Sequence, residues 1–185
     1  MTTRTVRTMS VAASAAWLVL AAEGVAEAVA DDSGWERSYV IVGVAIVVGA
    51  ALSVAVAARL TEEADRPKLR TAGLVVAALG GVVALIGPWL LPVWMFLLGV
   101  GFGMVAAASA PRWRRPMALL ATAQLAGIVV LIGGITAEIG RRDSYGDYPV
   151  AEAIALGFVG LATIAALLYL TTEPRRALTA RASAG

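Results

Sequence analysis

Residues 71–110 read TAGLVVAALGGVVALIGPWLLPVWMFLLGVGFGMVAAASA and contain no charged side chain. A transmembrane helix needs about 20 apolar residues to cross the hydrocarbon core of a bilayer, so this run is too long for one helix. Pro88 and Pro92 interrupt it, and two prolines four residues apart cannot both lie inside a regular helix. Trp89 and Trp94 lie beside the prolines, and tryptophan prefers the headgroup level. The stretch therefore predicts two spans joined by a tight turn.

The rest of the chain has the same pattern of apolar segments separated by short polar stretches. Hydrophobic residues make up 59% of the 185 residues, well above the roughly 45–50% of soluble domains. The predicted fold class is an all-α, polytopic transmembrane helix bundle with no separate soluble domain. The six predicted spans are about 9–30, 39–58, 71–87, 93–110, 116–137 and 149–171, followed by a short tail at 172–185. The last two spans each open on a proline, which suits the first turn of a helix.

Basic residues are distributed unevenly between the two sides that six spans would create. Only Arg37, Arg141 and Arg142 fall on one side. The other side holds Arg4, Arg7, Arg59, Arg66, Lys68, Arg70, Arg112, Arg114, Arg115, Arg175, Arg176 and Arg181. Cytoplasmic loops carry the excess of lysine and arginine, so both termini are predicted to be cytoplasmic (N-in/C-in). Most acidic residues fall toward the outer side.

A cleavable signal peptide is the rival interpretation of the first span. Arg4 and Arg7, the apolar stretch 11–22 and the small residues 28–30 resemble one. Cleavage after Ala30 would leave five spans with an outside N-terminus. The acidic, long stretch 23–30 argues against cleavage, and six spans remain the preferred interpretation.

The chain contains no cysteine and no histidine. This excludes disulfides, thiolate and imidazole metal sites, and nucleophilic catalysis that relies on a histidine base. No phosphate-binding glycine loop is present either. We therefore expect no enzyme activity and no cofactor, and the short connections offer no nucleic-acid surface.

The polar residues inside the predicted spans form the candidate site. Glu23 and Glu27 are four apart and share one face of the first span. If that span is 9–30, Glu23 lies about 5 Å beyond its midpoint, within the hydrocarbon. The groups expected to meet this pair are Gln124, Thr136, Glu138 and Arg141 or Arg142 of the fifth span. The pattern predicts that Glu23 faces the bundle interior, either protonated or paired.

Small residues predict where helices approach each other. Gly99, Gly103 and Ala107 recur every four residues, the spacing that allows close helix contact in lipid. The segments 80–87 and 127–134 also resemble each other, and each follows an Arg-Pro pair. A parallel repeat of two-helix hairpins would explain that resemblance, although Gly/Val/Ile segments also align by chance.

Two classes of function remain open. The first is a non-catalytic membrane subunit that binds lipid or another membrane protein, including a second copy of the chain. The alternative is a small transporter or channel-like protein in which Glu23, with Glu27, handles a proton or cation. The lipid bilayer is the expected partner in both, and the plasma (inner) membrane of a bacterium is the expected location.

Overall fold

The fold is known from a computed structural model, which describes residues 3–29, 35–87, 90–139 and 149–182. Within these residues the regular secondary structure is entirely helical, and the connections between helices are turns or irregular segments. The helices are α1 (Thr3–Val29), α2 (Trp35–Leu60), α3 (Pro67–Ile86), α4 (Leu91–Ala108), α5 (Pro111–Ile139) and α6 (Pro149–Ala182). Each contains a segment long and apolar enough to cross a bilayer. The all-α, six-span prediction is therefore confirmed, and the protein is a multi-pass membrane protein.

The boundaries of α5 and α6 are among those that differ from the predicted spans. Helix α5 begins at Pro111, so Pro116 lies inside the helix instead of opening it. Its first turn is formed by the carbonyl of Ala110, which accepts hydrogen bonds from the amides of Trp113 and Arg114. A proline this close to the N-terminus removes only one backbone hydrogen bond of the helix. At the other end of the chain, α6 continues as helix to Ala182, through most of the predicted tail.

The predicted break in the apolar run falls between Ile86 and Leu91. The amide of Gly87 donates to the carbonyl of Val83, and the amide of Leu90 donates to the carbonyl of Gly87. Trp94 was expected at the headgroup level, but its side chain is fully buried inside the bundle. Residues 88 and 89, which include Trp89, lie outside the described part of the chain.

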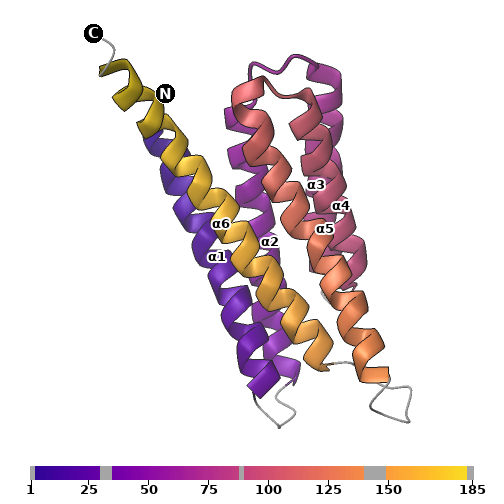
Figure 1. The fold of residues 1–185 in the computed structure, drawn as a ribbon. Helices are drawn as coiled ribbons and strands as arrows, with labels where there is room; N and C mark the ends of the chain where they lie inside the picture. The colour runs from indigo at the N-terminus through magenta and orange to yellow at the C-terminus, as the bar shows by residue number, and fades with distance from the viewer. Residues whose placement is uncertain (1–2, 30–34, 88–89, 140–148, 183–185) are drawn as a thin grey trace.

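The six helices form a ring in chain order, which α1 and α6 close by packing against each other. Figure 1 shows that the start of α1 and the end of α6 lie at the same end of the bundle as the α2–α3 and α4–α5 turns. We call this the inner end, because the basic residues predict it to be cytoplasmic. The opposite, outer end carries the α3–α4 turn.

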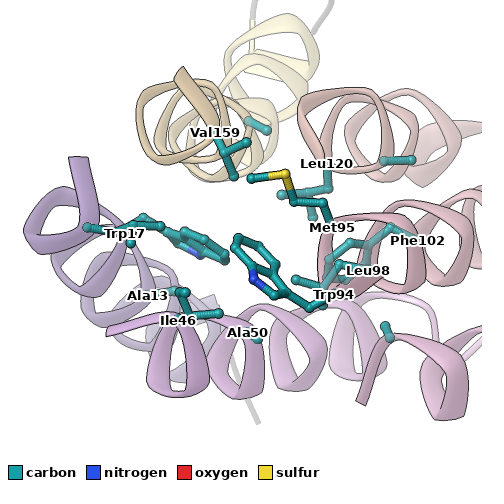
Figure 2. Close-up of a cluster of buried hydrophobic side chains, with 14 of the residues drawn as sticks. Ala13, Trp17, Ile46, Ala50, Trp94, Met95, Leu98, Phe102, Leu120 and Val159 are labelled. Atoms are coloured by element: carbon teal, nitrogen blue, oxygen red, sulfur yellow. The ribbon is translucent and has the colours of Figure 1, made fainter. Parts of the chain in front are cut away.

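Large apolar side chains fill the interior of the ring. Figure 2 shows Trp17 and Trp94 pointing toward each other, with Met95, Leu98 and Phe102 beside them. All five side chains are fully buried. The indole Nε1 of Trp17 donates to Ser53 Oγ at 3.1 Å, so the polar edge of this buried ring is satisfied by α2.

Small residues bring α3 and α4 into backbone contact. The buried residues of α3 are Gly73, Ala77, Gly80 and Ala84. A Cβ added to Gly101 of α4 would lie 2.5 Å from the backbone nitrogen of Ala77. Helices α1 and α6 meet in the same way, since a Cβ on Gly24 would lie 2.7 Å from the carbonyl oxygen of Ala153. Close approach of this kind increases van der Waals contact, the main source of helix association in lipid.

The three small residues of the stripe predicted in α4 have different surroundings. A Cβ on Gly99 would lie 2.6 Å from Cγ of Leu125 in α5. A Cβ on Gly103 would lie 3.9 Å from Cβ of Ala121, an ordinary contact distance. Ala107 is exposed. Only Gly99 in this stripe has the crowded surroundings that a larger side chain could not enter without displacing a neighbour.

Candidate polar site of the spans

The depth of each polar residue along the bundle can be estimated from its position relative to α4. This helix has 18 residues and is therefore about 27 Å long, close to the thickness of the hydrocarbon core. Its ends at Leu91 and Ala108 thus mark the two approximate boundaries of the hydrocarbon. Met95 lies about 6 Å inside the outer boundary by the rise of 1.5 Å per residue.

Three close contacts show which residues of the other helices lie at the same depth as Met95. A Cβ on Gly127 of α5 would lie 3.4 Å from Sδ of Met95 and would also touch Cγ2 of Val159 in α6. A Cβ on the next residue of α6, Gly160, would lie 2.7 Å from the carbonyl oxygen of Trp17 in α1. Met95, Gly127, Val159 and Trp17 therefore lie at nearly the same depth.

Glu23 is six residues beyond Trp17 toward the outer end, a distance of about 9 Å. This places its Cα about 3 Å beyond the level of Leu91, inside the outer turns of the apolar segment Arg4–Ala26 of α1. The sequence-based depth, about 5 Å from the midpoint of its span, is therefore too deep. The difference arises because α1 begins at Thr3, six residues before the predicted start, and because the α3–α4 turn lies well short of the outer ends of α1 and α5 (Figure 1).

The side chain of Glu23 is half-buried, and it makes no hydrogen bond or ion pair with the residues that the structure describes. Its helix packs mainly on α2 and α6. The adjacent Gly24 lies against α6, where an added Cβ would be 3.0 Å from the backbone nitrogen of Gly157. Because α6 stands between α1 and α5, the structure does not bring Glu23 together with the polar residues of α5.

Those α5 residues have other neighbours. Gln124 is fully buried and its Nε2 donates to Thr163 Oγ1 of α6 at 2.8 Å. The hydroxyl of Thr136 is exposed and donates to the carbonyl of Ile132 in its own helix. Glu138 is largely buried, and its Oε2 accepts a hydrogen bond of 3.1 Å from the amide of Ala151. The side chain of Glu27 and all of Arg141 and Arg142 lie outside the described residues.

Glu138 has a structural role at the start of α6. The first amides of a helix have no partner within that helix, and Pro149 lacks an amide hydrogen. The Glu138 carboxylate accepts from one of these amides, and a negative charge there also complements the helix dipole. Glu138 therefore ties the outer end of α5 to the first turn of α6.

The Gln124–Thr163 pair is a buried polar contact deep in the bundle. Gln124 lies three residues inward of Gly127, within about 3 Å of the level of the midpoint of α4. Its Oε1 is buried and has no hydrogen-bond partner in the described structure. Gln124 was predicted from the sequence as part of the polar site, but Thr163 was not. A threonine in an apolar span is a weak signal, because its hydroxyl can bond to its own helix.

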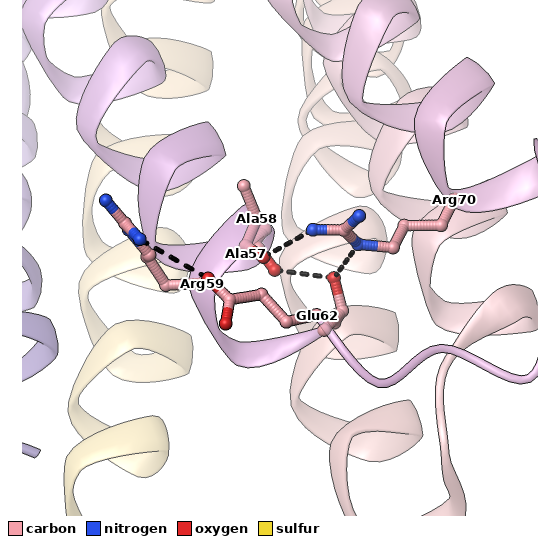
Figure 3. Close-up of polar contacts among 6 residues, drawn as sticks. Ala57, Ala58, Arg59, Glu62 and Arg70 are labelled. Carbon is pink, nitrogen blue, oxygen red and sulfur yellow. Dashed lines mark hydrogen bonds and ion pairs between the residues drawn. The ribbon is translucent and has the colours of Figure 1, made fainter. Parts of the chain in front are cut away.

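Polar contacts at the inner end, missed by the sequence analysis, join α2 to α3. The Arg70 guanidinium donates through Nη2 to the carbonyl of Ala58 at 2.6 Å and through Nε to Thr61 Oγ1 at 3.0 Å. Figure 3 shows this contact beside the Arg59–Glu62 ion pair. Cations favour the C-terminal carbonyls of a helix, so Arg70 caps α2.

Potential metal ligands are not clustered in the part of the chain that the structure describes. Among these residues, no cluster of three or more histidine, cysteine, aspartate or glutamate side chains could hold a metal ion. Glu23 and Glu138 lie on either side of α6 and have no described contact with each other. Comparisons of the chain with protein-family models, curated proteins and solved structures find no match.

Proposed function

We propose that this protein is a non-catalytic membrane protein that acts by binding lipid or another membrane protein on the lipid-facing surface of its helices. The observation that carries this proposal is the filling of the ring. Trp17, Trp94, Met95, Leu98 and Phe102 are all fully buried in its interior. Side chains of this size, packed against one another, leave the outward-facing surface of the helices as the place for interaction. The expected setting is the plasma membrane of a bacterium.

The placement of the carboxylates supports the same proposal. A transporter of protons or cations commonly carries an ionisable group within the membrane, facing the bundle interior or a hydrated cavity. Glu23 lies in the outer turns of the apolar segment of α1, away from its middle, and Glu138 accepts a hydrogen bond from the start of α6. Gln124 and Thr163, a buried polar pair deep in the bundle, are not ionisable.

The alternative function is proton or cation handling by Glu23. The observation in its favour is that Glu23 is half-buried and has no described partner. Proton uptake into proteoliposomes, driven by a potassium diffusion potential and followed with an internal pH dye, separates the two functions. The Glu23→Gln variant removes the charge and retains the shape, while Asp65→Asn at the exposed α2–α3 turn is the matched control.

We expect the wild type to carry no flux above empty liposomes and both variants to match it. Flux in the wild type that is lost in Glu23→Gln but retained in Asp65→Asn would refute the proposal and establish the alternative. Size-exclusion elution and helical circular dichroism of each variant would verify that the protein is folded.

A further inference from the structure

Two turns at the inner end are held together across the end of α4. The amide of Arg66, just before α3, donates to the carbonyl of Ala108 at 3.4 Å. In the first turn of α5, Nη2 of Arg112 pairs with Oε2 of Glu63 at 3.0 Å. The residues that follow Glu63 and Arg112 are therefore carried on adjacent, connected turns.

The basic side chains of this region fall into two groups. Arg59, Arg70 and Arg112 each have a carboxylate, carbonyl or hydroxyl partner within the protein. The other group is exposed and makes no side-chain hydrogen bond or ion pair in the described structure. It consists of Arg66, Lys68, Arg114 and Arg115, which we call the basic corner.

The local acidic residues do not balance the basic corner. Glu62 is paired with Arg59, and Glu63 is paired with Arg112. Asp65 alone remains, exposed and without a described partner. Neither α3 nor α5 has an acidic residue of its own in its first turn. In the described structure, this region therefore holds four unpaired cations and one unpaired carboxylate.

The depth of the basic corner identifies the kind of anion that fits. Arg114 lies 13 residues inward of Gly127, or about 20 Å, which is close to the inner boundary marked by Ala108. The next residues, Pro116 and Met117, are already buried within the bundle. Trp113 is half-buried at the same level, where tryptophan commonly meets headgroups. A ligand here has its anionic group beside the arginines and continues into hydrocarbon.

We propose that the basic corner binds the phosphate headgroup of an anionic phospholipid, whose acyl chains lie along the apolar surface of α4 and α5. This inference rests on the proposed function, because it names a membrane component that the lipid-facing surface of the helices binds. Charge complementarity and position at the hydrocarbon boundary favour a phospholipid over free phosphate. Clusters of lysine and arginine next to membrane spans are typical of sites for anionic lipid.

The test compares two variants that remove equal charge from the same end of the bundle. Arg114→Gln/Arg115→Gln alters the basic corner, while Arg4→Gln/Arg7→Gln alters exposed arginines on α1. Each purified protein is titrated with phosphatidylglycerol or phosphatidylcholine in mixed micelles. The retained lipid is measured by native mass spectrometry, and the unfolding temperature is recorded.

We expect phosphatidylglycerol, but not phosphatidylcholine, to be retained and to stabilise the wild type. The corner variant should need about fivefold more phosphatidylglycerol for each cation removed, because one cation near an anionic surface contributes about 1 kcal/mol. The control variant should bind as the wild type does. If the double variant does not fold, Lys68→Gln tests the same corner from α3.

Equal losses in the two variants would overturn the proposal, since the effect would then come from the general charge of the inner end. Retention of the two lipids to the same extent would overturn it as well. Stabilisation by inorganic phosphate that matches the effect of phosphatidylglycerol would show that free anions are the ligand. If the basic corner does not bind lipid, the proposed function is still tested separately by the flux assay, which does not depend on the basic corner.

Discussion

The contact between α3 and α4 gives the sharpest test of the packing. A Cβ on Gly101 would lie 2.5 Å from the backbone nitrogen of Ala77 and 2.7 Å from the carbonyl oxygen of Gly73. Ordinary van der Waals contact begins at 3.4 Å. Because the opposing atoms belong to a helix backbone and cannot rotate away, Gly101→Ala requires α3 and α4 to separate by about 0.9 Å at this point.

The cost of this separation can be set against the gain in helix propensity. A radial gap of 0.5–1 Å forfeits about a quarter to a half of the dispersion energy of each affected contact. Overpacking of a well-packed interior typically costs about 1–3 kcal/mol, while alanine favours a helix over glycine by about 1 kcal/mol. We therefore expect Gly101→Ala to lower the free energy of unfolding by about 1 kcal/mol, and Gly101→Leu to lower it further.

Gly103 provides the matched control on the same helix. A Cβ there would meet only Cβ of Ala121 at 3.9 Å, so Gly103→Ala should be neutral or stabilising by up to about 1 kcal/mol. Equilibrium unfolding in mixed micelles with increasing dodecyl sulfate, followed by circular dichroism, gives both values. If Gly101→Ala is as stable as Gly103→Ala, the backbone contact between α3 and α4 is not as close as described, and the reasoning fails.

Two further predictions concern the ends of the bundle. Reporter fusions at Ser33, at Ala64 and after Ala184 should report outside, inside and inside, because the basic residues favour cytoplasmic termini; an outside signal at Ala184 would contradict this orientation. Glu138→Ala should lower the free energy of unfolding by about 1 kcal/mol in the same assay, because an amide of α6 loses its acceptor. Glu138→Gln, which keeps an acceptor oxygen, should cost less, and an equal loss in the two variants would exclude this capping role.

The six spans could be predicted because membrane insertion depends on local composition. Each span must be long and apolar enough by itself to cross the bilayer, so hydropathy reports it directly. The break between α3 and α4 was also readable, since proline disrupts a helix through its own ring. The start of α5 was mispredicted because Pro116 was taken as the first helical residue, whereas Pro111, which suits a first turn equally well, opens the helix.

The packing of the spans was harder to predict, because lipid and protein interior are both apolar. In a soluble helix, the polar face shows which side is outside, but a membrane span has apolar residues all round. The α3 face of Gly73, Ala77, Gly80 and Ala84 therefore had the same appearance as several other stripes of small residues in a chain with 19 glycines. The buried position of Trp94 was hidden for the same reason.

The order of the helices in the ring determines which polar side chains of the candidate site can meet. Glu23 and Glu138 could be expected to meet only if α1 and α5 were neighbours, yet α6 lies between them in the ring. Gly24 lies against the carbonyl of Ala153, and Glu138 accepts from the amide of Ala151, so α1 and α5 contact α6 within three residues of each other. The first turns of α6 therefore lie between the two carboxylates. A substitution that shifts this helix, such as Gly24→Leu, should disturb the surroundings of both.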